Sequence, residues 1–428
     1  MMIIYYIIRM VNWNDLPTLA NIKDKFNLKK ANNKNIEDFK ESIYYFVEEY
    51  LKDNIRVYEK YHFLEVVYED IFKIIIDTYG DTVIDSFSIP LETVIHECIE
   101  LYFLINDKPR SFKKTLILKD PNINYVKSIF EKVKSKEQPD QRTEEWFMFR
   151  WNLLTASSIW KAIDSTAMVN SITYDKCKPI NISSKTSVNI NSPFHQGHKY
   201  EPLSSLMYEY LYDTKVGEFG CIKHDTIPFL GASPDGINID EKNVRFGRLL
   251  EIKNPVSDRL LNGIPKKDYW IQMQIQMEVW CLDECDFLET RFKTYESEED
   301  FNNDGTFNKT KDGKFKGIIL QFHDGNEPIY EYPPFNISKK EFDQWSEKCI
   351  NEKSHLTWIG YTYWFLDNYS CALVLRNKEW FKEIQPILEN VWDTIIKERV
   401  TGYNHRKPKK RVKKKDEQNQ SIIIKIDT

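Results

Sequence analysis

Glycine and proline are scarce in this sequence, with 14 and 17 residues among 428. This low content argues against collagen-like, linker-dominated and turn-dense all-β chains. The seven cysteines include no Cys-x-x-Cys pair, so they favour reduced thiols over a disulfide framework or an iron–sulfur cluster. The apolar opening, residues 1–8, is far shorter than the ~20 residues that cross a bilayer. We expect it to be a strand or the start of a buried helix, and we expect no membrane span.

Aromatic and charged residues are abundant instead. Hydrophobic residues make up 41% and aromatic residues 14% of the chain, which is typical of a globular protein of two to four domains. The formal net charge of −5 conceals a basic segment, residues 406–415, with eight lysines and arginines. The rest of the chain is acidic, so a nucleic-acid site there must be a local basic groove. The basic segment itself is predicted to be a DNA tether, a nuclear import signal or a solvated terminus.

Hydrophobic periodicity predicts helices across residues 36–105 and a polar connector at 132–143. Thr143 is a predicted N-cap for the helix that follows. The next region mixes both element types and therefore predicts an α/β core. Its predicted strands lie near 220–223, 228–233, 248–253, 287–292 and 317–322, its helices near 197–212 and 267–281, and later helices near 338–350 and 379–398. Residues 165–191 have little periodicity and are predicted to be a loop.

The strongest chemical signal is Asp235, which follows an apolar strand, and the later strand that carries Glu251 and Lys253. Alternate side chains of a strand share a face, so Glu251 and Lys253 point together while Leu250 and Ile252 enter a core. Two carboxylates brought together by neighbouring strands can hold a hard divalent cation, and the carbonyl group of Ile252 can add a third ligand. The competing interpretation is an exposed strand face with a surface ion pair.

Other fragments accompany this signal in order. They are Trp146-x-x-x-Arg150, Leu154-Thr-Ala-Ser157, Gly197-His-Lys-Tyr-Glu201, Gly231-Ala-Ser-Pro-Asp-Gly236, Leu250-Glu-Ile-Lys253 and Tyr269-x-x-Gln272-x-Gln274. With these six blocks, residues 140–292 resemble the YqaJ-like viral recombinase family, which includes the lambda-type exonucleases, within the PD-(D/E)xK nucleases. The resemblance covers roughly a third of the chain.

The resemblance implies a role for each matching position. Asp235, Glu251 and Glu201 would be catalytic acids that bind metal, with Ile252 contributing its carbonyl group, and Lys253 would be the catalytic lysine. The predicted cofactor is Mg²⁺, with Mn²⁺ as a substitute. The residues predicted to bind DNA, most of them around a terminal 5′-phosphate, are Arg150, Ser157, Ser233, Gln272, Tyr269 and Gln274. A planar arginine with hydroxyl and amide donors suits a phosphate dianion.

The resemblance also implies a fold and an organisation. The expected fold class is α/β, a restriction-endonuclease-like core with a mixed central sheet flanked by helices and helical additions at both ends. The predicted domains are a helical N-terminal domain at 1–135, the nuclease core at 136–335, a C-terminal helical extension at 336–403 and the basic tail at 404–428. Pro202 directly follows Glu201, which fits a helix only if the proline lies in its first turn.

The predicted function is a metal-dependent exonuclease that degrades linear double-stranded DNA 5′ to 3′ from phosphorylated ends, in viral-type recombination or genome processing. A structure-specific endonuclease and a catalytically idle DNA-binding or scaffold member of the fold remain alternatives. The predicted partners are double-stranded DNA ends, a single-strand annealing protein and further copies of the chain. The predicted location is intracellular, in the cytoplasm of a host cell or in its nucleus if the source is viral.

Two further patterns bind metal in other proteins. His195, His198, Cys221 and His224 form two pairs of zinc-type ligands, 22 residues apart. His96-Glu97 begins a near match to the HExxH zinc motif, but Glu100 replaces the second histidine. Both patterns are weaker than the carboxylate pair, because histidines are more often solvated or packed in a core than bound to metal.

Overall fold

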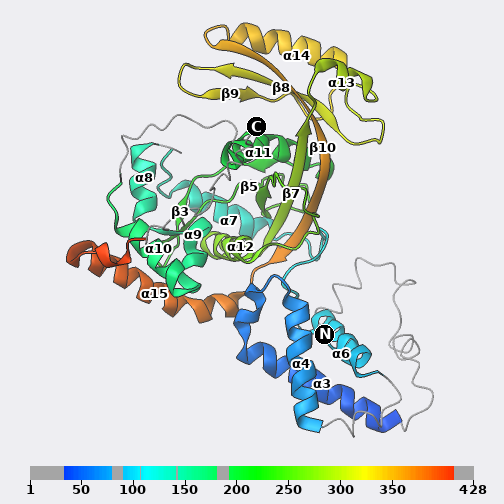
Figure 1. The fold of residues 1–428 in the computed structure, drawn as a ribbon, viewed down its shortest axis with the longest axis vertical. Coiled ribbons are helices and arrows are strands. Elements are labelled where there is room, and N and C mark those ends of the chain that lie inside the picture. The colour runs from blue at the N-terminus through cyan, green and yellow to red at the C-terminus, as the bar shows by residue number, and fades with distance from the viewer. Residues whose placement is uncertain (1–32, 80–89, 107, 141–142, 181–191, 409–428) are drawn as a thin grey trace, which may run out of the picture.

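The computed structural model describes residues 33–79, 90–106, 108–140, 143–180 and 192–408 (Figure 1). The apolar opening at residues 1–8 and most of the basic segment lie outside these ranges, so the predictions for them stay untested. Among the described residues, no helix is long and apolar enough to cross a membrane.

The N-terminal part is helical, as predicted. Helices α3 (Asn33–Asp53), α4 (Phe63–Tyr79) and α6 (Leu91–Ile105) present apolar stripes at three- and four-residue spacing and bury them against one another. The short helix η1 (Ile55–Glu59) links them to the rest of the chain. There the buried Glu59 side chain accepts a 3.1 Å hydrogen bond from the indole of Trp380.

A seven-stranded mixed sheet forms the centre of the molecule, and its strand order is β2-β5-β6-β7-β10-β8-β9 (Figure 1). The strands are β2 (Val216–Gly217), β5 (Gly236–Asn238), β6 (Leu249–Lys253), β7 (Glu284–Thr294), β10 (Thr357–Leu375), β8 (Lys316–His323) and β9 (Pro328–Glu331). The pair β6–β7 is parallel and the other neighbours are antiparallel. The Asp324-Gly325 turn joins β8 to β9 in an antiparallel hairpin.

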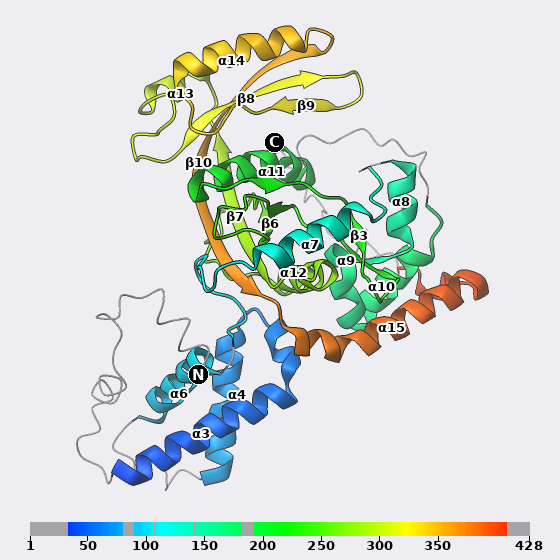
Figure 2. The same cartoon turned by 180° about the vertical axis from the view of Figure 1, so that it is seen from behind.

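Two helices cover opposite faces of this sheet, α11 (Pro193–Tyr212) and α12 (Lys267–Trp280) (Figures 1 and 2). Leu250 and Ile252 of β6 pack on the α11 side in a cluster with Leu203. Leu249 packs on the other side in the cluster that holds Met273 of α12. The expected α/β class, with a mixed central sheet between helices, is therefore confirmed.

A second, three-stranded sheet lies beside the first, with the order β1-β4-β3. Its strands are β1 (Leu154–Thr155), β4 (Leu230–Ala232) and β3 (Ile222–Lys223), and β1 and β4 are parallel. Helix α8 (Glu144–Trp151) precedes β1, and the Thr143 hydroxyl accepts a 3.2 Å hydrogen bond from the Trp146 amide. The predicted N-cap is confirmed. Helix α9 (Ala156–Ile159) follows β1.

The remaining described helices are α7 (Ile123–Lys134), η2 (Trp160–Ile163), α10 (Thr166–Cys177), α13 (Glu298–Asn303), α14 (Lys339–Glu352), α15 (Lys378–Thr401) and η3 (Asn404–Arg406). Ser338 and Glu341 form a capping box at the start of α14. The predicted helices near 338–350 and 379–398 are confirmed by α14 and α15. The domain boundaries themselves stay a prediction.

Two expectations about elements are wrong. The C-terminal extension, residues 336–403, is not purely helical, because β10 runs through it as a 19-residue strand. Its many aromatic and β-branched residues suit a strand, and pairing with both β7 and β8 fixes it in the sheet. The predicted loop at 165–191 begins instead with helix α10, which buries Ile172 and Cys177 in the core that also contains Ile395 of α15.

Candidate functional site

The structure places Asp235 beside β6, as the spacing predicts. Asp235 lies in the turn between β4 and β5, and β5 pairs with β6 in the register Gly236–Leu250. The Asp235 amide donates to the carbonyl oxygen of Leu250 at 3.1 Å. Its carboxylate accepts a 2.7 Å hydrogen bond from the amide of Ile252. Strand pairing thus closes the sixteen-residue gap to Glu251.

Glu251 points away from Leu250 and Ile252, as predicted, but the face that it shares with Lys253 is covered by α12. Its side chain has 0% exposure. One carboxylate oxygen pairs with Lys253, and the other accepts a 2.7 Å hydrogen bond from Gln276 Nε2. The surface-ion-pair interpretation is therefore wrong, because the Glu251 carboxylate is buried and not solvated. Burying a charged group costs free energy, which its contacts with Lys253 and Gln276 offset only in part.

Burial and charge shift the pKa values of this group. Burial, followed by the charges of Glu251 and Glu201, raises the pKa of Asp235 well above its usual value, although Lys253 opposes the shift. Burial acts to lower the pKa of Lys253, but Glu251 and Asp235 outweigh it and raise that pKa. The site thus holds two acids that repel each other and one lysine that stays protonated. A divalent cation would relieve that repulsion.

Glu201 lies in the middle of α11 and is exposed. The helix begins at Pro193, so Pro202 does not occupy the first turn, contrary to our expectation, and Glu201 is helical all the same. Its charge acts on Asp235, which places both acids in one electrostatic neighbourhood. Over the described ranges, no group of three His, Cys, Asp or Glu side chains gathers closely enough to hold a metal ion.

Two of the predicted phosphate ligands, Ser157 and Ser233, follow neighbouring strands of the small sheet. Thr155 pairs with Gly231, so β1 and β4 lie side by side. Ser157 and Ser233 each come two residues later, just after the ends of these neighbouring strands. The guanidinium group of Arg150 lies 3.5 Å from the Ser157 hydroxyl. It also lies over the ring of Trp146, 4.6 Å from the centroid, which orients its planar fork.

Helix α12 joins these two parts of the site. Gln276 Nε2 donates to the carbonyl oxygen of Ser233 at 3.1 Å as well as to Glu251. The Lys253 ammonium lies 5.1 Å from the ring centroid of Tyr269. Tyr269, Gln272 and Gln276 are spaced three and four residues apart, so they share one side of the helix. Gln272 is half-buried on that side.

Gln274 does not belong to the site, contrary to our prediction. Its side chain is buried on another face of α12. The amide nitrogen donates to the carbonyl oxygen of Leu375 at 2.9 Å, and the amide oxygen accepts from the backbone of Asn377 at 2.7 Å. Gln274 therefore anchors the turn between β10 and α15. Two positions along a helix correspond to a rotation of about 200°, which is why Gln276 and not Gln274 reaches Glu251.

Two residues near the site were not predicted. The spacing of four between Gln276 and Gln272 puts both on one helix face and was a usable signal. Lys176 lies on α10, the helix that we predicted to be a loop, and its ammonium donates to the carbonyl oxygen of Arg150 at 2.7 Å. Burial, with the nearby charges of Arg150 and Arg399, lowers the pKa of Lys176 to about 8. Lys176 thus adds positive charge beside Arg150 at neutral pH.

The two other metal patterns are not supported. His195 contacts the Tyr330 hydroxyl at 2.6 Å, whereas Cys221 is buried in a small cluster with Phe149 and Leu153. His224 lies 3.7 Å from a Glu278 carboxylate oxygen. The first pair of the pattern, His195 and His198, therefore contacts different residues from Cys221 and His224. In the HExxH-like pattern, His96 stacks on Tyr68 at 4.2 Å between ring centroids, which is a packing role.

The residues of this site, from Arg150 to Gln276, fall within a known family model. Residues 145–284 match the YqaJ-like viral recombinase domain. The family resemblance predicted from the six motif blocks is confirmed.

Individual relatives extend the comparison beyond the YqaJ-like domain. The chain is 31% identical over 302 residues to an uncharacterized protein of Acanthamoeba polyphaga mimivirus. That alignment covers 62% of this chain and 54% of the viral protein, so the chain spans about half the length of that relative. An alkaline exonuclease of Laribacter hongkongensis is 20% identical, with a TM-score of 0.36, over 60% of this chain and 94% of its own. Its complex with dAMP gives the same values.

Proposed function

We propose that this protein is a metal-dependent nuclease that degrades linear double-stranded DNA from its ends. The observation that carries the proposal is the Asp235–Glu251–Lys253 group, buried under α12 and tied through Gln276 to the strand end that bears Ser233. An acid pair with an adjacent lysine is suited to phosphodiester hydrolysis, and the basic groups near Arg150 are suited to a phosphate.

The proposed cofactor is Mg²⁺, with Mn²⁺ as a substitute. The donor set fits a hard cation, because Asp235 and Glu251 supply carboxylate oxygens whose repulsion raises the pKa of Asp235. The carbonyl group of Ile252 and the exposed Glu201 are the proposed additional ligands. Bound there, the cation would activate a water and stabilise the charge that develops on the phosphate.

The residues of the chain have separate proposed tasks. Lys253 remains protonated because its pKa is raised, so it would orient the attacking water and balance negative charge rather than act as a base. Gln276 fixes the orientation of the Glu251 carboxylate. Tyr269 packs against the lysine ammonium and limits its freedom.

End recognition is the second part of the proposal. Arg150, Ser157, Ser233 and Gln272 would bind a terminal 5′-phosphate, with Lys176 adding charge. A strand held at its 5′ end next to the carboxylate pair would present a nearby linkage for cleavage, which supports degradation in the 5′ to 3′ direction. Trp146 would hold the Arg150 fork ready for bidentate contact.

The wider role is also proposed. A viral relative and the YqaJ-like domain support a function in viral-type recombination or genome processing, with double-stranded DNA ends, a single-strand annealing protein and further copies of the chain as partners. The site of action would be the host cytoplasm or nucleus. In the described part of the basic segment, Arg406 is paired with Glu398 at the end of α15, and the segment as a whole is the proposed tether or import signal.

One assay tests the activity. Linear duplex, closed circular duplex and single-stranded DNA are incubated with the protein in Mg²⁺ or EDTA and resolved on a gel. We expect loss of linear duplex in Mg²⁺ alone. Cutting of closed circles would favour a structure-specific endonuclease, and binding without any cutting would favour a scaffold protein. Asp343→Asn is a matched control, since Asp343 forms only a surface pair with Lys339 at 2.9 Å.

A further inference from the structure

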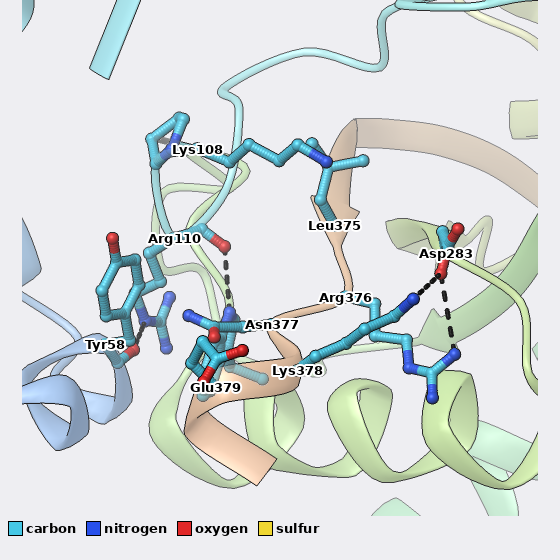
Figure 3. A pocket seen from close by; sticks show the side chains of 11 residues that line it. Tyr58, Lys108, Arg110, Asp283, Leu375, Arg376, Asn377, Lys378 and Glu379 are labelled. Carbon is cyan, nitrogen blue, oxygen red and sulfur yellow. Dashed lines mark hydrogen bonds and ion pairs between the residues drawn. The ribbon is translucent and has the colours of Figure 1, made fainter. Parts of the chain in front are cut away.

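A pocket of about 310 Å³ lies where several segments of the chain meet, and none of its lining residues belongs to the candidate nuclease site (Figure 3). Tyr58 of η1 and Trp270 of α12 contribute to its walls. The turn from β10 into α15 contributes residues 375–379, and the segment before α7 contributes residues 108–110. Four of the lining side chains are cationic, namely Lys108, Arg110, Arg376 and Lys378, against two acidic ones, Asp283 and Glu379.

Arg110 is the unusual member of this lining. Its side chain is almost fully buried, at 3% exposure. Its Nε donates to the carbonyl oxygen of Tyr58 at 2.8 Å, but Nη1 and Nη2 have no hydrogen-bond partner. Burial lowers the pKa of Arg110 to about 9, so the group is still charged at neutral pH. A buried cation with unused donors is costly, and native structures normally satisfy such donors.

The acidic residues of the pocket are already matched. Asp283 lies 3.6 Å from Arg376 and 3.9 Å from Lys378, and Figure 3 shows both cations reaching toward it. Arg376 also pairs with Glu278 at 2.7 Å. Glu379 pairs with Lys382 at 2.7 Å. Neither carboxylate of the pocket therefore forms an ion pair with Arg110.

The pocket also includes the N-terminus of a long helix. Asn377 is the N-cap of the 24-residue helix α15 and accepts a 3.0 Å hydrogen bond from the Trp380 amide. The N–H groups of a first helical turn point toward this end and carry a partial positive charge. Arg110 carries a positive charge and the helix N-terminus a partial positive charge, so both favour an anion with several acceptor oxygens.

We propose that this pocket is an anion site that binds a phosphate group through Arg110, Lys378 and the N-terminus of α15. Such an anion would tie η1 and the β10–α15 turn to α12, the helix that carries Gln272 and Gln276. The phosphate belongs either to a free phosphate compound or to a DNA backbone, and the experiment below distinguishes these sources. The proposal does not depend on nuclease activity.

Calorimetric titration with inorganic phosphate tests the proposal, in EDTA and at constant ionic strength. The full chain carries Arg150→Ala, so that the predicted 5′-phosphate site does not contribute. We expect saturable binding that Arg110→Met and Lys378→Met each weaken roughly 10-fold or more, the usual loss for a charge-assisted contact. Lys348→Met on α14 is the control, since that side chain is 74% exposed, and it should change nothing.

Lys378→Met keeps the test decisive if Arg110→Met does not fold, because the Lys378 side chain is 61% exposed. A short duplex then identifies the source. Competition between duplex and phosphate, with weaker duplex binding by Lys378→Met, assigns the site to a DNA phosphate, whereas unchanged duplex affinity assigns it to a free phosphate compound. Absence of saturable phosphate binding, or phosphate binding by both pocket variants as tight as that of the Arg150→Ala parent, would overturn the proposal and leave a water-filled pocket.

Discussion

Gln276, on the helix α12 that covers β6, donates a 2.7 Å hydrogen bond to the Glu251 carboxylate. The same amide nitrogen reaches the carbonyl oxygen of Ser233 at 3.1 Å. One side chain therefore connects the acid pair on the large sheet to the strand end on the small sheet. Its amide oxygen is buried without a hydrogen-bond partner, so the residue is held by these two donated bonds.

Replacing Gln276 by Met should test this connection. The change keeps the volume of the side chain but removes both donated bonds. Because partners of a metal ligand typically contribute about 10- to 100-fold, we expect the maximal rate to fall by roughly that factor and the Mg²⁺ requirement to rise. Gln272→Met is the matched control and should alter end preference alone. An unchanged Mg²⁺ titration for Gln276→Met would contradict the connection.

Asp235→Asn should abolish turnover and yet stabilise the metal-free protein. Burial and Glu251 raise the pKa of Asp235, so its ionised form costs folding free energy at neutral pH, and a neutral amide removes that cost. We expect at least a ~10³-fold lower rate and a melting temperature in EDTA higher by about 1–3 °C. Mg²⁺ should raise the melting temperature of the wild type only. Calorimetric scans with and without Mg²⁺ measure the two changes in melting temperature, and a nuclease assay measures the rate.

Arg150→Ala should remove much of the preference for phosphorylated ends. Loss of a charge-assisted contact costs roughly 1.5–3 kcal/mol, which corresponds to about a 10- to 150-fold slower rate on 5′-phosphorylated duplex. Duplexes with 5′-hydroxyl ends serve as the internal control and should be much less affected. Arg150→Lys should rescue only in part, because an ammonium lacks the planar fork. Equal wild-type rates on both kinds of end would remove the end-recognition model.

Lys176 predicts a pH dependence of phosphate recognition. Its pKa is lowered to about 8, so the ammonium charge beside Arg150 is present below that pH and is lost as pH rises through it. The preference for phosphorylated over hydroxyl ends should therefore decline severalfold between pH 7 and pH 9. Lys176→Arg should hold the preference nearly constant, because arginine remains charged over this range. A parallel decline in both proteins would rule out Lys176 as the titrating group.

Much of the site could be read from the sequence. The alternation along β6 predicted that Glu251 and Lys253 share a face, and the hydrophobic runs on either side predicted paired strands that bring Asp235 to them. A local signal also predicted the N-cap at Thr143. The shared face and the cap depend on residues a few positions apart, so short-range geometry determines them, and a turn between neighbouring strands closes the longer gap to Asp235.

What each face meets was decided only by tertiary structure. Periodicity cannot tell whether the Glu251 face is solvated or covered, and it was α12 that buried it. Gln274 and Gln276 look alike in sequence, yet packing of α12 against β10 on one side and β6 on the other gave them different partners. The Arg110 pocket likewise joins Tyr58, Trp270 and Asn377 from distant segments. Such contacts arise from long-range packing, which the spacing of residues along the chain does not encode.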